Sequence, residues 1–281
     1  DVLAISGTGT FSGSVVQLAD ISGGTLPAGV SAAMITCGTC VGPFTGLNSN
    51  DLTFSATFNP SNVTFNVLGL INRWILNGSG AWETAANWSR GVVPNSSQDV
   101  FIDVTGTTET ITLASGQTIK SLTSNENLTL STGGNLTYAS PSTVAAGLTL
   151  SGGSLLGPGA MTVSGPITWN AGTISGGLVI ANGGITFATA GSRTLGSILT
   201  VNAASVLPTG LSLSTNGATI NGSATFSNQG AINVSGGLSL ATGGTHSGTF
   251  ILSPSSSLAF SGGTQSITAA GSISGSGTVV V

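Results

Sequence analysis

Residues 127–184 decide the fold; they contain NLTLSTGGNLTYAS (127–140), GLTLSGGSLLG (147–157), AMTVSG (160–165), PITWNAG (166–172) and GLVIANGG (177–184). In these pieces apolar residues alternate with Ser, Thr or Asn, and Gly closes almost every piece. Alternation with period two is typical of a β-strand with one buried face. Gly and Asn supply the positive φ angles of tight turns. The pattern continues to SGSGTVVV (274–281) without a helical period, so the whole run predicts β structure.

The strand centres recur with a period of about 20 residues. Two series follow this period: Leu148, Ile167 and Ile185, then Leu211, Ile232 and Phe250. Secondary centres lie between them: Met161, Leu178, Leu199, Ile220, Leu238 and Leu258. Two or three short strands per period make one coil of a β-solenoid, which buries its inward residues by stacking on its neighbours. We therefore predict that Asp in place of Ile167 or Leu211 collapses the stack, because a buried carboxylate without a partner is costly.

An antiparallel sandwich is the competing architecture, since it also has short strands at spacings of roughly 8–12 residues. The turns here are too many and too short for a sandwich, and charge is too scarce. We predict an all-β chain whose main part is a parallel β-helix, or β-solenoid. The general preference for right-handed parallel crossovers predicts a right-handed helix.

Charged residues make up only 4% of the 281 residues, against roughly 25% in globular proteins. A net charge of −4 without a basic cluster excludes nucleic-acid binding, which needs several cations in one place. A surface hydrated by Ser, Thr and Asn favours an extracellular or cell-surface location. No stretch approaches the roughly 20 apolar residues of a membrane-spanning helix. The start, DVLAISGTGTF (1–11), has no signal-peptide pattern, which we interpret as a removed leader or a section of a longer chain.

Residues 1–70 are predicted to form a small separate β unit. They contain the alternating runs GTFSGSVVQL (9–18) and DLTFSATFNPSNVTFNVLGL (51–70). Within the second run, Asn59-Pro60-Ser61-Asn62 is a strong turn signal. We therefore expect TFSATF (53–58) and VTFNVL (63–68) to pair as a hairpin.

Residues 71–104 contain the densest motif of the chain. Its elements are Trp74, Gly78-x-Gly80-x-Trp82, Ala85, Asn87-Trp88-Ser89, Gly91, Pro94 and Asp99-Val100-x-Ile102. Trp74, Trp82 and Trp88 lie within 15 positions of one another. We predict that they form an aromatic cap over the open end of the coil stack, where unpaired strand edges need cover. The solenoid itself is then predicted for residues 105–281.

This motif resembles the block that opens a β-helical module in bacterial secreted β-strand-repeat proteins of the autotransporter-like and filamentous-haemagglutinin-like kind. The order GTFSG (9–13), LPAG (26–29) and FNPSNVTFNV (58–67) is similar to the segment that closes a module in the same proteins. No linker separates residue 70 from Trp74. The resemblance therefore implies one module running directly into the next, in a polymer unit or in part of a very large surface protein.

The two cysteines form a CxxC pair, Cys37-Gly38-Thr39-Cys40. A redox motif would need a βαβ context, and a zinc site would need two further ligands, whereas the only histidine is distant. We favour a structural disulfide between Cys37 and Cys40 in an oxidising compartment. A bridge to a neighbouring subunit and free thiols are the alternatives.

Three further residues are candidates for chemistry. His246, in GGTHSGTF (243–250), is interpreted as a surface turn histidine rather than a catalytic one, so that His246→Ala is predicted to have no effect. Asp99 and Asp103 are four residues apart, on one face of a regular strand, and form a weak calcium candidate. The alternative is that Asp99 caps the turn after Pro94 and Asp103 is solvated.

Catalysis on the solenoid is not expected, and no cofactor is predicted. Carbohydrate cleavage on a β-helix needs titratable groups a few ångström apart. Residues 127–281 contain no Asp, Glu or Lys and a single Arg, and the chain has neither a GxSxG elbow nor a P-loop. We therefore predict that the protein is not an enzyme.

Eight Asn-x-Ser/Thr sequons are candidate glycosylation sites that would clothe an almost uncharged surface. They are Asn62, Asn77, Asn87, Asn95, Asn127, Asn135, Asn221 and Asn233. In a chain this rich in Asn, Ser and Thr, several sequons arise by chance.

The leading functional hypothesis is an extracellular structural or adhesive protein. Its coils would stack into a stiff rod, fibre or sheath, with self-association end to end through strands such as SGTVVV. The alternative is a binding solenoid, for cell-surface glycans through exposed aromatics such as Trp88, Tyr138 and Trp169, or for ice through Thr rows. The sequence shows Thr8-Gly9-Thr10 but no T-x-T that recurs at one coil position.

Overall fold

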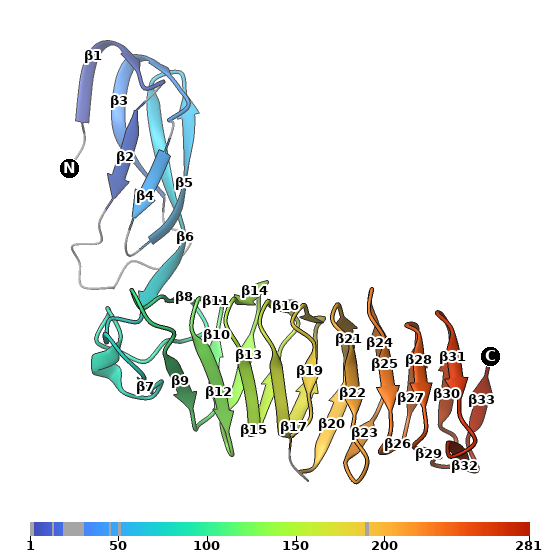
Figure 1. Cartoon of the computed structure of the whole chain (residues 1–281). Coiled ribbons are helices and arrows are strands. Elements are labelled where there is room, and N and C mark those ends of the chain that lie inside the picture. The colour runs from blue at the N-terminus through green and yellow to red at the C-terminus, as the bar shows by residue number, and fades with distance from the viewer. Residues whose placement is uncertain (1–2, 13, 19–30, 45, 50–51, 189–190) are drawn as a thin grey trace.

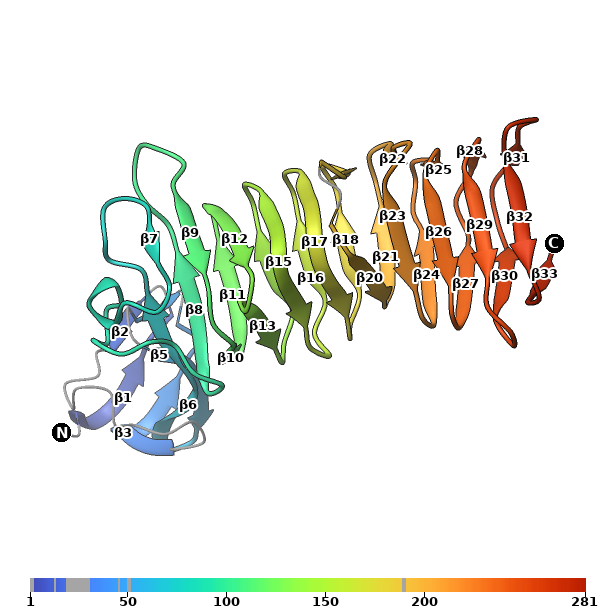
Figure 2. The same cartoon turned by 90° about the horizontal axis from the view of Figure 1, so that it is seen from below.

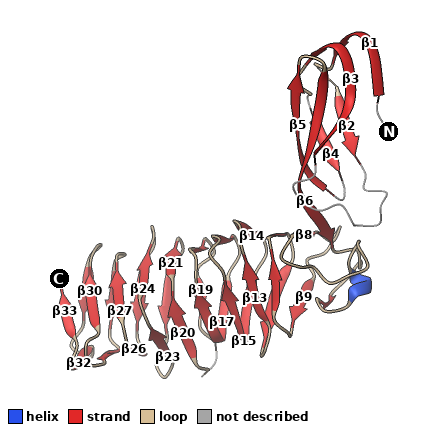
Figure 3. Ribbon diagram, turned by 180° about the vertical axis from the view of Figure 1, so that it is seen from behind, coloured by secondary structure: helices blue, strands red, loops and turns tan. Residues whose placement is uncertain are grey.

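The computed structural model describes residues 3–12, 14–18, 31–44, 46–49, 52–188 and 191–281. A small N-terminal β unit stands at one end of a long row of stacked coils (Figure 1). Within the described residues the only helical segment is a short 3₁₀ turn, η1 (Ala85–Asn87) (Figure 3). The LPAG segment of the resemblance lies outside the described residues.

The row of coils is a parallel β-solenoid of about nine turns, as the sequence period predicts (Figure 2). Parallel pairing excludes the antiparallel sandwich for these residues. Each coil contributes one strand to each of three faces, and every strand pairs with its counterparts in the neighbouring coils.

The first face contains β8 (Gln98–Ile102), β11 (Ser121–Ser124), β14 (Ser142–Val144), β16 (Met161–Val163), β18 (Val179–Ala181), β21 (Ile198–Val201), β24 (Ala218–Asn221), β27 (Gly237–Leu240), β30 (Ser257–Phe260) and β33 (Thr278–Val280). The second face contains β7 (Gly80–Ala81), β9 (Thr110–Leu113), β12 (Asn127–Ser131), the first halves of β15 (Leu148–Leu156) and β17 (Ile167–Ser175), β19 (Ile185–Thr186), β22 (Ser205–Leu207), β25 (Phe226–Asn228), β28 (Gly244–His246) and β31 (Gln265–Ile267). The third face contains β10 (Gln117–Ile119), β13 (Asn135–Tyr138), the second halves of β15 and β17, β20 (Arg193–Gly196), β23 (Ser212–Thr215), β26 (Ala231–Val234), β29 (Thr249–Leu252) and β32 (Ser272–Gly275).

The interior is a stack of aliphatic side chains at alternate positions of each strand. Leu148, Ile167 and Ile185 are register partners in successive coils and are buried, as predicted. Two predicted centres are wrong by one or two positions. Val179, not Leu178, and Leu213, not Leu211, occupy the fully buried inward positions.

Local chemistry explains both corrections. Leu178 and Val179 are adjacent apolar residues, so alternation alone does not say which of them points inward. Leu211 ends a tight turn, where its N–H donates to the carbonyl of Pro208 at 3.2 Å. Its side chain therefore packs at the edge of the core rather than inside it.

Glycine at the corners lets consecutive coils approach closely. Gly172 has a φ of 104°, in the left-handed region, and a Cβ there would lie 1.9 Å from the carbonyl oxygen of Gly153. A Cβ at Gly165 would lie 1.7 Å from the carbonyl oxygen of Ala146. Since both obstacles are backbone atoms, any larger residue would separate the coils.

The N-terminal unit is built from β1 (Leu3–Thr10), β2 (Val15–Leu18), β3 (Ser31–Val41), β4 (Gly46–Ser49), β5 (Leu52–Asn59) and β6 (Asn62–Arg73). β5 and β6 form the predicted hairpin, with Asn59 opposite Asn62 at its turn. The ring centroids of Phe44 and Phe58 are 4.9 Å apart in the core of the unit. β6 then continues into the solenoid, where its end, residues 70–73, pairs in parallel with β8.

Candidate functional surfaces

The three tryptophans of the motif are buried in one cluster at the start of the solenoid. The ring of Trp88 lies edge-on to Trp74 and Trp82, with centroids 5.1 and 4.8 Å away. Trp88 Nε1 donates to the carbonyl of Trp82 at 2.6 Å. The backbone N–H of Trp82 donates to the carbonyl of Thr112 at 2.9 Å, which attaches this segment to the second face. The cluster is continuous with the aliphatic core of the coils.

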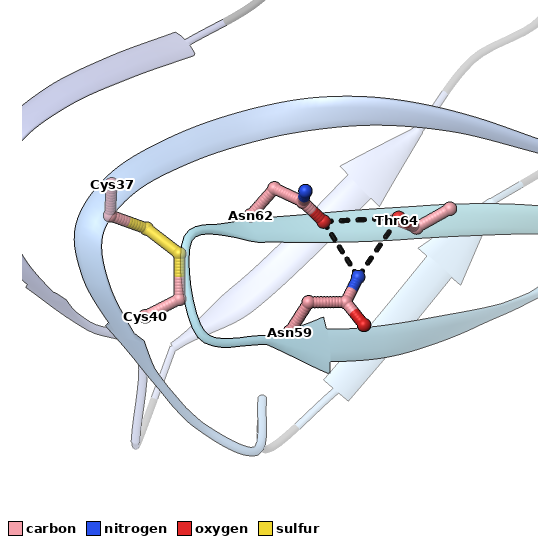
Figure 4. The surroundings of a disulfide bond; sticks show 5 residues. All are labelled: Cys37, Cys40, Asn59, Asn62 and Thr64. Atoms are coloured by element: carbon pink, nitrogen blue, oxygen red, sulfur yellow. Dashed lines mark hydrogen bonds between the residues drawn. A yellow bond between two sulfur atoms is a disulfide. The ribbon is translucent and has the colours of Figure 1, made fainter.

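Cys37 and Cys40 are joined by a disulfide within β3, beside the turn of the β5–β6 hairpin (Figure 4). The N–H groups of Cys37 and Cys40 donate to the carbonyls of Ser61 and Pro60, each at 2.9 Å. The Asn62 amide oxygen accepts from Asn59 Nδ2 at 2.6 Å on the same turn. The bridge therefore closes the loop that holds the hairpin turn.

Asp99 and Asp103 lie on or directly after β8, and each has partners of its own. Lys120 Nζ is 2.8 Å from Asp99 Oδ2, and Ser121 Oγ donates to Asp99 Oδ1 at 2.5 Å. Asp103 is exposed, and its carboxylate accepts from Asn125 Nδ2 at 3.1 Å. Calcium takes roughly six to eight oxygen ligands, and a lysine ammonium next to Asp99 is unlike such a site. Over the described ranges no three or more His, Cys, Asp and Glu residues gather where they could hold a metal.

His246 does not lie in a surface turn, and this prediction is wrong. It ends β28, its side chain points inward, and it is fully buried. The Asn228 N–H donates to His246 Nδ1 at 3.2 Å, and Nε2 is 2.7 Å from Gln265 Oε1. The turn signal GG precedes the strand, but the alternation continues through Thr245 and places His246 on the core side. Burial lowers the pKa of His246, an effect that outweighs the opposing hydrogen bond to Gln265.

Arg193 was missed as a functional or structural residue by sequence reasoning. It is buried on β20, and its guanidinium donates to the carbonyls of Trp169 at 2.6 Å, Gly191 at 2.9 Å and Ser212 at 3.3 Å. The guanidinium carbon lies 5.6 Å from the ring centroid of Phe187. Burial lowers the pKa of Arg193. The available signal was its isolation, since Arg193 is the only Asp, Glu, Lys or Arg in residues 127–281.

The outward positions of the second face carry a row of threonines. In five successive coils the register partners are Thr112, Thr129, Thr149, Thr168 and Thr186. Neighbouring strands are spaced by roughly 4.8 Å, so the row repeats its hydroxyl and methyl groups at that interval. Because coil lengths vary by a few residues, a search for threonines at one fixed sequence spacing does not find this row. T-x-T occurs on this face in β9 only, at Thr110 and Thr112.

The aromatic residues that glycan stacking would require are not on the surface. Trp88, Tyr138 and Trp169 are all buried in the solenoid core. Burial raises the pKa of Tyr138 to about 12. Stacking of sugars on these three side chains is therefore excluded in the folded state.

The sequon asparagines differ in exposure. Asn77 and Asn95 are exposed. Asn87 is buried, and its Nδ2 donates to the carbonyl of Ala81 at 3.0 Å, so that its amide is inaccessible in the folded chain. The others are half-buried: Asn62, Asn127, Asn135, Asn221 and Asn233.

In the coil formed by residues 265–281 the inward side chains are only partly covered. Ile267, Ile273 and Val279 are the register partners of fully buried residues in the coil before. Yet Ile267 and Val279 are each 41% exposed. At the other end, β6 covers the first face and β7 covers part of the second. The two ends of the coil stack therefore present different surfaces.

None of the helical structure in the described ranges has the length and apolar character needed to cross a membrane. No family model, curated protein or solved structure matches the chain. The β-solenoid fold is consistent with β-helical proteins in general.

Proposed function

We propose that the protein is an extracellular structural or adhesive protein whose solenoid acts as a stiff rod. The observation that carries this proposal is the unbroken ladder of the first face, from β8 to β33. Its hydrogen bonds join successive coils along the long axis, and a close-packed aliphatic interior resists bending and proteolysis. A relationship to autotransporter-like or haemagglutinin-like secreted proteins is part of this proposal, and it rests on the Trp motif of residues 71–104.

Two observations support an extracellular location. The Cys37–Cys40 disulfide suits an oxidising compartment. Residues 127–281 have one charged side chain other than histidine, which suits a surface-attached or polymerised protein better than a freely diffusing one. The role we propose is mechanical rather than catalytic, with the packing residues and corner glycines as its key positions.

Self-association is proposed to use the end formed by residues 265–281. There Ile267, Ile273 and Val279 would gain cover from a further coil or a second copy, and the edges of β31, β32 and β33 would gain partners. At the opposite end Trp74, Trp82 and Trp88 would serve as a cap. Because the two ends differ, pairing of two copies through their last coils is the simplest symmetric arrangement.

Electron microscopy of the purified protein with and without reductant tests this proposal. We expect rods joined at one end, and Ile273→Asp should return them to single rods. Thr278→Asp, on an outward position of the same coil, is the matched control and should leave the joined rods intact. Single rods for the unaltered protein at every concentration would exclude self-association. Joined rods that separate only with reductant would make the cysteines, rather than the last coil, the point of association.

A second candidate function is binding to an ordered, uncharged surface such as ice or crystalline polysaccharide, favoured by the threonine row. Thr149→Lys with Thr168→Lys would place two charges on this row. Thr143→Lys with Thr162→Lys, on the first face, is the matched control. Thermal hysteresis and sedimentation with insoluble polysaccharide should fall only in the first variant. Equal values for both variants and the unaltered protein would exclude the row as a binding surface.

A further inference from the structure

His246 is the only histidine of the chain. It lies inside the solenoid on β28, which pairs with β31 of the following coil, residues 265–281. Its ring is edge-on to Phe250 at a centroid distance of 5.2 Å and tilted against Phe260 at 6.3 Å. The mechanical function proposed above does not use this residue. A buried imidazole is nevertheless the side chain whose charge changes most readily near neutral pH.

The hydrogen bonds around His246 fix one neutral form of the ring. Nδ1 accepts from the backbone N–H of Asn228, so Nδ1 carries no proton. The amide nitrogen of Gln265 donates to the carbonyls of Thr242 and Gly262, which leaves Oε1 of Gln265 facing Nε2 of the ring. Nε2 therefore carries the proton and donates it to Gln265. The network joins three successive coils through β25, β28 and β31.

A second proton on the ring has no acceptor in this site. It would sit on Nδ1, opposite the Asn228 N–H, so that two donors would face each other. The elements packed against the ring are β25, β28, β29, β30 and β31, and none contains another ionisable side chain. The other charged side chain of residues 127–281, Arg193, belongs to β20, several coils away. The imidazolium would therefore be buried without a counter-charge, which is costly.

We propose that His246 is an acid-sensitive latch for the last two coils, residues 244–281. Protonation breaks the contact with Asn228 and drives the ring towards water, and the ring reaches water only when β28 and the strands after it detach from β25, β26 and β27. Opening begins in residues 265–281 because the inward side chains of this coil are the least covered, with Ile267 and Val279 each 41% exposed. It uncovers the inward side chains of the preceding coil and its strand edges.

The direction of the pH dependence follows from linkage. Burial lowers the pKa of His246 in the closed coils, whereas the open coils expose a ring with an ordinary pKa of about 6.5. Above that pH both forms are neutral and the latch has no effect. As the pH falls below it, the open form gains a proton that the closed form lacks, so the closed form loses stability until the pH reaches its own pKa.

Hydrogen exchange of the full chain tests the latch between pH 7 and pH 5. Exchange protection of residues 244–281 is compared at each pH with that of residues 120–165 in the same molecule, which removes the intrinsic pH dependence of exchange. In the unaltered protein we expect this ratio to fall by up to about tenfold per pH unit below pH 6.5, the limit for one linked proton. In His246→Asn, whose amide oxygen replaces Nδ1 as acceptor but never becomes charged, the ratio should not change.

A second measurement uses the unaltered protein alone. A single histidine gives a single ring Cε1–H signal in NMR, so its titration is followed directly. We expect the signal to titrate together with the loss of protection. A ring that titrates near pH 6.5 while residues 244–281 stay protected would overturn the proposal. An equal fall in protection for the His246→Asn variant would overturn it as well.

Discussion

The solenoid contains two regions that share the same parallel ladders but are held by different interactions. One is the first coil with its preceding segment, residues 62–126, and the other is the run of coils after residue 127. Eight of the charged side chains lie between residues 73 and 126, against one between residues 127 and 281. In the first coil, buried Glu126 accepts from the N–H groups of Val104 and Glu109, and Glu83 accepts from Ala114 and Ser115. Carboxylates thus satisfy the backbone of the longer loops there.

The later coils need no carboxylates because their turns are short and closed by glycine. Their polar backbone groups pair along the ladders, and uncharged side chains extend some of these ladders, as where Asn202 Nδ2 donates to Asn182 Oδ1 at 2.8 Å. Salt and pH should therefore act mainly on the first coil, with His246 as the exception. Burial of apolar side chains should dominate the stability of the later coils.

The largest effect is expected from a charge placed inside the later coils. Ile167→Asp buries a carboxylate among aliphatic residues and should reduce the free energy of unfolding by several kcal/mol, or abolish folding. Thr168→Asp, the next residue and outward-facing, is the matched control and should change it by less than about 0.5 kcal/mol. Urea denaturation followed by circular dichroism measures both. Equal stability of the two variants would contradict the register described here.

The same experiment separates the corrected register from the predicted one. Leu213→Asp should be as damaging as Ile167→Asp, because Leu213 is fully buried. Leu211→Asp should cost less, because Leu211 is partly exposed at the end of its turn. The reverse order would restore the register predicted from the sequence.

Arg193 tests whether one charged residue matters in coils that otherwise lack charge. Arg193→Met keeps much of the side-chain volume but leaves the carbonyls of Trp169, Gly191 and Ser212 without their donors. We expect a loss of about 1–3 kcal/mol in unfolding free energy, the usual cost of buried polar groups left unpaired. Arg193→Lys should lose part of this, since an ammonium cannot span the same three oxygens. A Met variant as stable as the original would show that relief from burying the charge offsets the lost hydrogen bonds.

The repeating parts of this fold could be predicted well from the sequence, whereas the buried polar residues could not. Alternation and glycine turns identified the coils, and Asn59-Pro60-Ser61-Asn62 identified the hairpin, because these are local signals. Arg193 was not placed in the core, because a polar residue in an alternating strand is normally taken as outward-facing. His246 was not placed there either, because the preceding GG was interpreted as a turn signal. Their burial depends on carbonyls and amides from neighbouring coils, which are near in space but about 20 residues away in sequence.

The threonine row illustrates the same limit. It becomes visible only when each coil is aligned by its strand register, since the spacing from Thr112 to Thr129 differs from that between Thr129 and Thr149. The clustering of the three tryptophans was predicted from their spacing, and the backbone hydrogen bond from Trp82 to the carbonyl of Thr112 could not be. Local pattern thus predicts which elements exist, and tertiary register decides which side chains meet.

A smaller effect is expected where the N-terminal unit joins the first coil. A Cβ at Gly69 would lie 2.5 Å from Lys120 Nζ and 2.6 Å from Asp99 Oδ2, so Gly69→Ala must open that ion pair. We expect a loss of up to about 1 kcal/mol at low salt, the usual range for a partly exposed pair. Gly196→Ala, whose Cβ would meet nothing closer than 3.5 Å, is the matched control in the later coils. Added salt should reduce the difference between the Gly69 variant and the original protein. A difference that is independent of salt would assign the effect to steric strain alone.

The smallest effect is expected from Glu83. Burial raises the pKa of Glu83, but hydrogen bonds from the N–H groups of Ala114 and Ser115 outweigh it and the pKa is lowered. A lowered pKa in the folded state contributes stability that is complete above the ordinary value of about 4.5 and is lost as the pH falls through the folded value. Glu83→Gln keeps an acceptor oxygen but cannot titrate, so its unfolding free energy should fall less steeply with acid below about pH 4.5. Because Glu83 is largely solvated, the change should be a small fraction of that for Gly69→Ala.

The two titrating groups make the comparison of regions testable by pH alone. His246 should weaken the last coils between pH 6.5 and pH 5, a range in which Glu83 stays ionised. Glu83 should weaken the first coil only at lower pH. Hydrogen exchange resolved by segment should therefore show two losses of protection, at opposite ends of the solenoid and in separate pH ranges. A simultaneous loss at both ends would mean that the coils open as one cooperative unit, and the difference in charge between the two regions would then have no effect on how the rod comes apart.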